Sequence, residues 1–140
     1  MLLKSDYYRP HREEIYMNPR QKDFFRTKLL EWRERLLSEG QASLQRIRNN
    51  ENIGGDLIDQ SVKENNKVMD FIARSRTEVT ILKINAALKR IQDNSYGYCL
   101  ETGEEIGIAR LLAYPIATLS VEAQEFLEKH QRVQQHRASS

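Results

Sequence analysis

The sequence is poor in cysteine, since Cys99 is the single example among its 140 residues. One cysteine excludes an intramolecular disulfide and leaves any four-cysteine metal site without most of its thiolates. The chain also lacks an apolar run approaching the roughly 20 residues of a membrane-spanning helix, and its first residues contain no apolar signal core. We therefore expect a cytoplasmic protein that does not contact the membrane.

Residue patterns that support catalysis are absent as well. The three histidines, His11, His130 and His136, lie near the two ends of the chain. The sequence contains no glycine-rich phosphate loop, no nucleophile motif and no acid–histidine pair at a useful spacing. These absences predict a protein that is not an enzyme.

The chain carries little net charge. Its formal net charge is +2, which by itself gives no argument for a nucleic acid partner. The charges are nevertheless patterned, because residues 20–48 carry eight basic and four acidic side chains, whereas residues 49–64 carry four acidic and one basic. The basic excess is spread along one segment and is not gathered in a recognition helix, so we expect no direct DNA binding.

Proline and glycine are rare between residues 20 and 49, which favours a long helix there. Asn18 and Pro19 form a strong start signal, because asparagine caps backbone amides and proline suits the first helical position. Four apolar residues then recur at spacings of four and three: Phe25, Leu29, Trp32 and Leu36. The helix is predicted to end near Asn50, in the asparagine- and glycine-rich stretch 49–55.

A second long helix is predicted from near Asp56 to about Asp93. Its predicted contact seam consists of six residues at spacings of four and three: Val68, Ile72, Ser75, Val79, Leu82 and Ala86. Two long helices joined by a short turn predict an antiparallel coiled-coil hairpin over residues 18–93, with its tip near residues 50–61. A plain helical bundle and a coiled-coil dimer fit the same periodicity. We expect a monomer rather than a dimer.

Residues 96–124 have the spacing of a small zinc-binding finger but not its ligands. Cys99 and Thr102 stand at the positions of a first C-x-x-C pair, and Ser120 and Ala123 at those of a second. A structural zinc site requires four soft donors around the ion, so we expect no zinc and no other cofactor. We interpret Cys99 as a partly buried residue rather than a redox sensor, because no neighbouring cluster of cations lowers its pKa.

Without a metal, this segment needs another source of stability. We expect a small apolar core, with the rings of Tyr96, Tyr98 and Tyr114 at its rim. The expected core residues are Ile106, Ile108, Leu111, Leu112, Ile116, Leu119, Val121, Phe126 and Leu127. A last helix is predicted from Thr118 to about His136. The predicted fold is therefore mainly α: the hairpin stands on a small globular region, residues 94–140, which includes a degenerate zinc-finger-like segment and packs with the N-terminal segment 1–17.

The predicted tip of the hairpin combines acidic and apolar side chains. Asp56 follows two glycines, where a helix-capping role accounts for it. Asp59 lies one turn further on, beside the apolar pair Leu57 and Ile58. Apolar residues beside a fixed carboxylate, at the far end of a long hairpin, predict a contact point for a partner.

These features together resemble the DksA/TraR family of bacterial RNA polymerase-binding factors, in its zinc-free form. The family carries an Asp-x-x-Asp-x-Ala pattern at its hairpin tip, which stands here as Asp56-Leu57-Ile58-Asp59-Gln60-Ser61. The separation of Asp59 from Cys99 and the stretch Tyr16-Met17-Asn18-Pro19 also resemble the family. The resemblance covers roughly residues 14–130.

The resemblance implies a partner and an activity. Such a protein binds bacterial RNA polymerase by inserting its hairpin through the secondary channel, where the tip residues Asp56, Leu57, Ile58, Asp59 and Ser61 make contact. It destabilises promoter open complexes, as in the stringent response. Arg76 matches a basic family position that faces the polymerase. The alternative is a Gre-like transcript-cleavage or anti-backtracking factor, which uses an acidic coiled-coil tip in the same channel to help hold a second magnesium ion.

The resemblance also bears on guanosine tetraphosphate, which the family binds only at its interface with the polymerase. Lys83 matches a family position near that site. Two other family cations are replaced here by Tyr114 and Gln124. Phosphate recognition needs several converging cations, so we expect a weakened response in which Arg110 substitutes in part.

Overall fold

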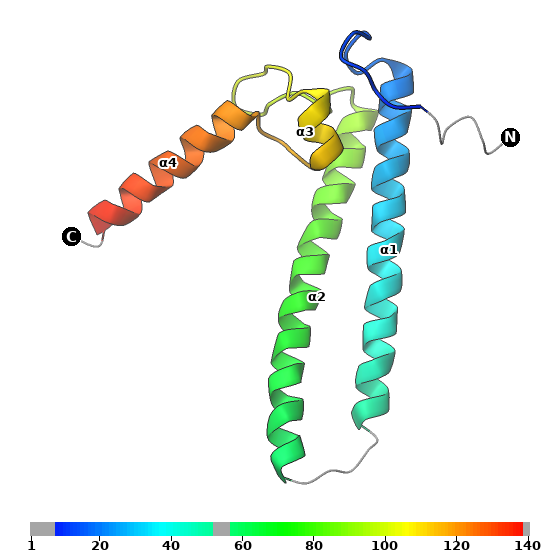
Figure 1. Ribbon diagram of the computed structural model, residues 1–140, viewed down its shortest axis with the longest axis vertical. Coiled ribbons are helices and arrows are strands. Elements are labelled where there is room, and N and C mark those ends of the chain that lie inside the picture. Colours follow the sequence, from blue (N-terminus) through cyan, green and yellow to red (C-terminus); the bar gives the residue numbers. More distant parts are fainter. Residues whose placement is uncertain (1–7, 52–56, 139–140) are drawn as a thin grey trace, which may run out of the picture. The chain divides into compact units, whose positions relative to one another are not determined.

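The computed structural model describes residues 8–51 and 57–138, of which residues 47, 50, 51 and 57–61 are described by their backbone alone. Four helices follow one another along the chain: α1 (Pro19–Glu51), α2 (Leu57–Gln92), α3 (Ile108–Ala113) and α4 (Val121–Ala138) (Figure 1). The described residues contain no β-strand, although an isolated antiparallel bridge pairs Tyr98 with Glu105. The prediction of a mainly α fold is confirmed.

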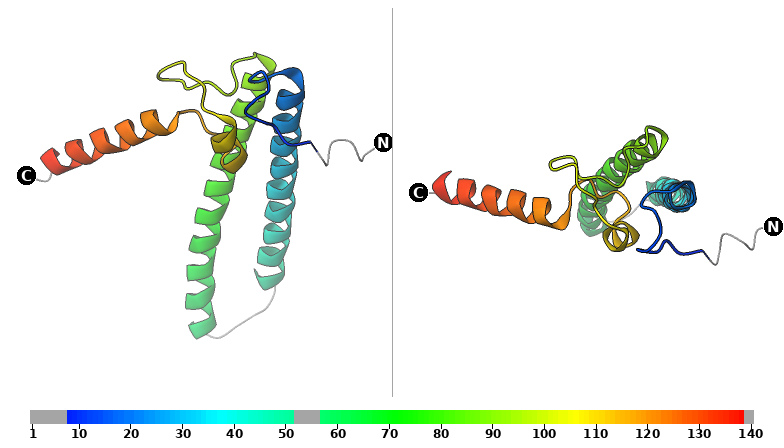
Figure 2. Two further views of the ribbon diagram at one scale, coloured as in Figure 1. Left: turned by 45° about the horizontal axis from the view of Figure 1, so that its top comes forward. Right: turned by 90° about the horizontal axis from the view of Figure 1, so that it is seen from above.

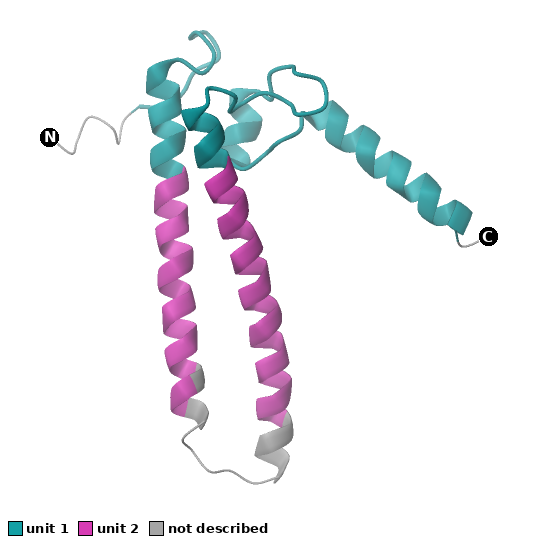
Figure 3. Ribbon diagram, turned by 180° about the vertical axis from the view of Figure 1, so that it is seen from behind, with its two compact units in different colours: residues 1–28, 87–140 teal, residues 29–86 magenta. Residues whose placement is uncertain are grey.

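The chain divides into two compact units (Figure 3). Unit 1 comprises residues 1–28 and 87–140, and unit 2 comprises residues 29–86. Unit 1 therefore holds the start of α1 and the end of α2, whereas unit 2 holds the long remainder of both helices. Within unit 2 the two helices run antiparallel and side by side, as expected for a coiled-coil hairpin (Figure 2).

Two polar side chains fix the start of α1 as the sequence predicted. The side-chain oxygen of Asn18 accepts a hydrogen bond from the backbone N–H of Gln21 (2.9 Å). This bond caps one of the amides that the first helical turn leaves without a partner. The fully buried Gln21 side chain accepts in return from the backbone N–H of Met17 (2.8 Å). The reciprocal pair holds residues 17 and 18 against the first turn of α1.

The inward face of α2 is not the predicted seam. Its buried and half-buried residues recur at spacings of four and three: Asp70, Arg74, Thr77, Ile81, Ile84, Leu88 and Ile91. Of the predicted seam, Val68, Ile72, Val79 and Leu82 are exposed instead. The two rows differ by two positions, which at about 100° per residue places them on nearly opposite faces of the helix. The predicted seam of α2 is therefore wrong.

The inward row of α2 was not predicted because several of its residues are polar. Asp70, Arg74 and Thr77 belong to it, so a search for apolar periodicity favours the other face. The predicted row of α1 fared better, since Phe25 and Leu29 are fully buried. In unit 2 the guanidinium of Arg33 on α1 donates a hydrogen bond to the side-chain oxygen of Asn85 on α2 (2.7 Å). Polar as well as apolar contacts thus join the two helices.

A small apolar core lies in unit 1. Tyr96 is at its centre, with its ring 5.6 Å from that of Phe25 and its hydroxyl donating to the backbone oxygen of Pro115 (2.7 Å). The other large buried residues are Ile91, Ile106, Ile108, Leu111 and Ile116. The predicted core positions 106, 108, 111 and 116 are confirmed, whereas Tyr96 lies inside the core rather than at its rim. A tyrosine can be buried in this way when its hydroxyl finds a hydrogen-bond partner.

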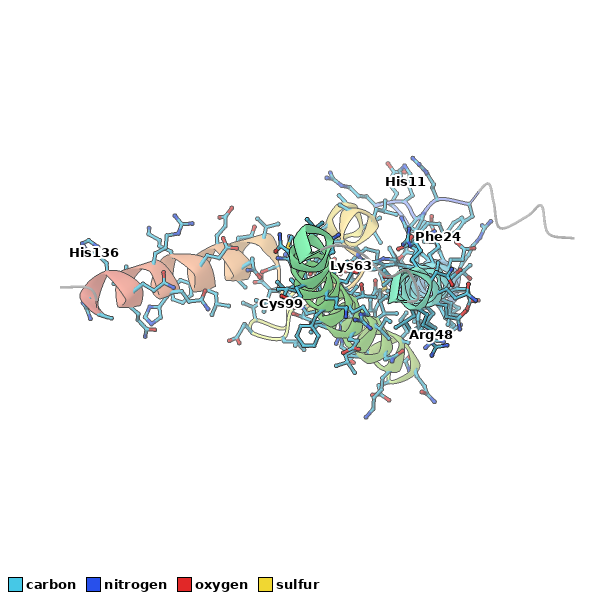
Figure 4. The ribbon with its side chains drawn as sticks, turned by 90° about the horizontal axis from the view of Figure 1, so that it is seen from below. His11, Phe24, Arg48, Lys63, Cys99 and His136 are labelled. Carbon is cyan, nitrogen blue, oxygen red and sulfur yellow. The ribbon has the colours of Figure 1, made fainter. Side chains whose placement is uncertain are left out.

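The last helix, α4, adds nothing to this core. None of its residues is buried, and Phe126 is 72% exposed, with Val121 and Leu127 also exposed. The expectation that these three residues belong to the core is wrong. Phe25 of α1 and Ile91 of α2, which lie far from them in the sequence, fill the core instead. Figure 4 shows α4 extending away from the segment around Cys99, with His136 near its far end.

Candidate functional site

The predicted tip lies at the start of α2. This helix begins at Leu57, directly after Asp56, which is outside the described residues. Leu57, Ile58, Asp59 and Ser61 belong to the first turns of α2, and their side chains are outside the described part of the structure. A carboxylate this close to a helix N-terminus is favoured by the positive end of the helix dipole. The tip residues therefore share the end of one helix.

The outward face of α2 is a row of exposed apolar residues, Val68, Ile72, Val79 and Leu82. Leu82 is 67% exposed and is the most exposed of the four. Arg76 and Lys83 are also exposed. Since successive residues of a helix are rotated by about 100°, both project to one side of this row, within about 80° of its centre around the helix axis. An apolar row flanked by cations has the chemistry of a surface for a partner with apolar and acidic groups.

Sequence reasoning thus found these residues but gave the apolar ones the wrong role. Val68, Ile72, Val79 and Leu82 were assigned to the helix–helix contact, and they face solvent. Arg76 and Lys83, selected only through the resemblance, lie beside them on α2. The signal that distinguishes the two faces is the half-buried row of Asp70, Arg74 and Thr77, which only the packed helices reveal.

The four positions of the degenerate finger supply a single thiol. Cys99 is a buried free thiol, 3% exposed. The hydroxyl of Ser120 accepts a hydrogen bond from the Ala123 N–H (3.2 Å), and the hydroxyl of Thr102 accepts one from the Glu104 N–H (3.3 Å). One thiol, two engaged hydroxyls and a methyl group do not supply the four soft donors that zinc requires. In residues 8–51 and 57–138, moreover, no three His, Cys, Asp or Glu side chains gather as metal ligands.

Backbone hydrogen bonds join the segment around Cys99 to the segment before α4. The N–H of Leu100 donates to the oxygen of Thr118 (2.8 Å), which joins the segment around Cys99 to the segment that leads into α4. Within the first half, the N–H of Gly103 donates to the oxygen of Cys99 (2.9 Å) and closes a tight turn. Gly103 has a φ of +74°, a conformation that glycine adopts without strain.

The polar surroundings of Cys99 change its acidity. Burial of the thiol acts to raise its pKa, but hydrogen bonds from the Thr102 side chain and from the backbone of Ser120, Thr102 and Glu101 act in the opposite direction. The hydrogen bonds prevail and lower the pKa of Cys99 to about 6. Cys99 is more deeply buried than the partly buried residue that was expected. Its lowered pKa was missed because the sequence was searched for nearby cations, not for hydrogen-bond donors.

Arg110 on α3 has a structural partner. Its Nε donates a hydrogen bond to the backbone oxygen of Leu119 (2.9 Å), which ties α3 to the segment before α4. Lys28 similarly donates through its ammonium group to the backbone oxygen of Leu112 (3.3 Å). Arg110 and Lys28 therefore each donate at least one hydrogen bond within the protein.

No helix in the described ranges is long and apolar enough to cross a membrane.

Comparison with known proteins agrees with this geometry. Two family models match the chain: "DnaK suppressor protein DksA, N-terminal domain" over residues 21–91, and "Prokaryotic dksA/traR C4-type zinc finger" over residues 94–129. The first spans the described parts of α1 and α2 almost entirely, and the second spans the degenerate finger and half of α4.

Relatives and a solved structure give the same result. The chain is 43% identical over 133 residues to the RNA polymerase-binding transcription factor DksA of Caulobacter vibrioides, covering 95% of this chain and 94% of that protein. It is 33% identical to DksA of Escherichia coli K12 over 82% of this chain and 76% of that one. The structure of transcription factor DksA2 from Pseudomonas aeruginosa matches with a TM-score of 0.78 and 37% identity, covering 84% of this chain and 90% of that one. The chain therefore belongs to the DksA/TraR family, in which it carries one of the four cysteines of the C4-type finger.

Proposed function

We propose that this protein is a transcription regulator that binds bacterial RNA polymerase through its α1–α2 hairpin and destabilises promoter open complexes. The names of its relatives in Caulobacter vibrioides and Escherichia coli, both RNA polymerase-binding transcription factors, support polymerase as the partner. Its place of action is then the cytoplasm. The family assignment does not favour the Gre-like alternative.

The observation that carries the proposal is the outward face of α2. Unit 2 exposes Val68, Ile72, Val79 and Leu82 along one side of a long helix, although a free-standing helix gains no stability from apolar residues in water. Arg76 and Lys83 flank the row and provide charge complementarity toward an acidic partner surface. A slender two-helix arm with such a face is suited to enter a narrow channel and bind its wall.

Regulation of this kind requires no chemistry by the bound factor. A protein that binds the closed promoter complex more tightly than the open one shifts the equilibrium by the difference between the two binding free energies. The tip residues Asp56 and Asp59, with Leu57, Ile58 and Ser61, are proposed to make the contacts that differ between the two states. We accordingly propose a regulator that is not itself an enzyme.

We also propose that the protein acts without zinc or any other bound cofactor. The degenerate finger has one thiol, and the hydroxyls at two of the other three positions already accept hydrogen bonds from the backbone. Guanosine tetraphosphate remains a ligand only at the polymerase interface, and with a weakened effect. Lys83 is exposed, but Arg110 is engaged with Leu119, and Tyr114 and Gln124 carry no charge.

The test is the lifetime of open complexes at a ribosomal RNA promoter, measured with purified polymerase in the presence and absence of the protein. A shortened lifetime is expected, and Asp59→Asn is expected to abolish it while leaving polymerase binding largely intact. Glu64→Gln, which removes a charge further along α2, serves as the matched control. An unchanged lifetime, or a fully active Asp59→Asn variant, would contradict the proposal, and cleavage of backtracked RNA would favour the Gre-like alternative.

A further inference from the structure

We propose that Tyr16 is the positioning residue of the finger loop 97–107, which it closes from outside by bonding to both ends of the loop. The inference concerns the structure of unit 1 and stands independently of the proposed function. Tyr16 lies in the N-terminal segment, 81 residues before Gly97 and 91 residues before Gly107. Its role is that of a cross-link between distant parts of the chain.

The hydroxyl of Tyr16 makes two hydrogen bonds at once. It donates to the backbone oxygen of Gly97 (2.6 Å) and accepts from the backbone N–H of Gly107 (3.1 Å). The same Gly97 oxygen also accepts from the N–H of Ile106 (2.8 Å), so the two ends of the loop converge on one point. A tyrosine hydroxyl can be donor and acceptor together, whereas a phenylalanine ring can be neither.

Ring packing and burial hold the hydroxyl in place. The ring of Tyr16 meets that of Tyr98 edge to face, with centroids 5.5 Å apart and planes at 84°. Tyr16 is half-buried, and this burial raises the pKa of its hydroxyl, which therefore keeps its proton for the bond to Gly97. Edge-to-face packing is a favourable arrangement for two aromatic rings.

The close approach of Tyr16 explains why residue 97 is glycine. Gly97 has a φ of +93°, and a Cβ atom placed on it would lie 3.0 Å from the Tyr16 hydroxyl and 3.0 Å from Cγ of Met17. An alanine here would be strained and would push against the hydroxyl at the same time. The backbone of the loop and the side chain of Tyr16 are thus fitted to each other.

The segment that carries Tyr16 is itself anchored to α1. The N–H of Met17 donates to the side-chain oxygen of the buried Gln21, and the N–H of Asn18 donates to the oxygen of Ile15 (3.3 Å). A chain of contacts therefore runs from the first turn of α1 through Tyr16 to both ends of the loop. The loop contains Cys99 and Thr102. Among the described residues, no group of three His, Cys, Asp or Glu side chains is placed to hold a metal ion there.

Hydrogen exchange tests the role directly, because the Gly107 amide donates to Tyr16. In Tyr16→Phe we expect this amide to exchange at least about tenfold faster, since loss of the partly buried hydrogen bond lowers the local opening free energy. Amides of α1 and α2 within unit 2 should keep their rates. Tyr98→Phe is the matched control, because it removes a hydroxyl from the same loop that bonds to no described residue, and it should leave Gly107 unchanged.

A double-mutant cycle provides a second, independent readout. Gly97→Ala presses on the Tyr16 hydroxyl, so part of its destabilisation should disappear in the Tyr16→Phe background, and the two effects on the unfolding midpoint should not add. Additive effects, or an unaltered Gly107 amide in Tyr16→Phe, would overturn the proposal. Loss of helical circular dichroism from the whole chain in Tyr16→Phe would overturn it too, because the proposed role is confined to unit 1.

Discussion

The two units of this protein use apolar residues in opposite ways. Unit 1 buries them: Phe25, Tyr96 and Leu111 are at most 1% exposed, and hydrogen bonds such as that from Tyr96 to Pro115 join segments distant in sequence. In unit 2, Leu29 and Ile84 near its two limits are the only described side chains that are buried, and none from Leu30 to Lys83 is buried. The comparison teaches that unit 1 buries most of its large apolar residues, whereas the long middle part of unit 2 relies more on helical backbone bonds and leaves apolar residues exposed to solvent.

The largest expected effect distinguishes the two units by stability. Leu111→Ala removes a fully buried side chain from unit 1 and should destabilise the protein by about 2–5 kcal/mol. The same substitution at the exposed Leu37 in unit 2 should change stability by less than about 0.5 kcal/mol. Urea unfolding followed by circular dichroism measures both variants. Equal losses at the two positions would contradict the distinction between the buried apolar residues of unit 1 and the exposed ones of unit 2.

The second prediction concerns a substitution that should weaken polymerase binding without changing stability. Leu82→Asp places a charge on the outward face of α2 and should weaken polymerase binding about tenfold, because a desolvated apolar contact is lost. Its unfolding midpoint should be almost unchanged, since Leu82 is exposed. A competition assay with labelled wild-type protein measures the affinity. Leu37→Asp changes an exposed leucine on α1 in the same unit and is the control that should bind normally. Equal losses of affinity in both variants would contradict a specific role of α2 in binding.

The third prediction concerns pH and is confined to unit 1. The pKa of Cys99 is lowered from its ordinary value of 9.0 to about 6 by hydrogen bonds from the residues around it. A lowered folded-state pKa means that this thiol's contribution to stability is complete above pH 9 and is lost as the pH falls through 6. As the pH is raised from 6 to 9, the unfolding midpoint of the wild type should therefore rise relative to that of Cys99→Ser.

The comparison with Cys99→Ser cancels the pH dependence that the two proteins share. Parallel pH profiles for the two proteins would show that the thiol keeps its ordinary acidity.

The smallest effect is expected from metal removal. A structural zinc site contributes on the order of 10 kcal/mol to a small fold, and chelation of such a site would unfold the finger. In the proposed zinc-free state, the hydrogen bonds of the Ser120 and Thr102 hydroxyls and the core around Tyr96 stabilise the finger without a metal. A chelator should leave the thermal midpoint unchanged, and metal analysis should find no equimolar zinc. A drop in the midpoint that added zinc reverses would contradict the proposal.

Much of this architecture was predictable from local patterns. Asn18 and Pro19 marked the start of α1, and the asparagine and glycine residues at 49–55 separated two long helices. Local capping and backbone preference determine such features, so they are readable residue by residue. The buried positions of Ile106, Ile108, Leu111 and Ile116 were also predicted, since large apolar residues are concentrated in this short segment.

Other features depended on contacts between distant residues. The role of Tyr16 requires Gly97 and Gly107, and the central position of Tyr96 requires Phe25 and Pro115. The exposure of Phe126 follows from the same fact, because the core was completed by residues of α1 and α2. No periodicity in the sequence records which distant segment completes a core.

By itself, the sequence determined that this chain forms a two-helix arm with a degenerate finger, and its motifs carried the family. Only the tertiary structure decided which face of α2 turns inward. Two helices pack by the fit of whole side chains, so the half-buried row with Asp70, Arg74 and Thr77 met α1, and the apolar row of Val68 and Leu82 was left to solvent. Apolar periodicity shows that a helix has a binding face, and the packing shows whether that face is already occupied.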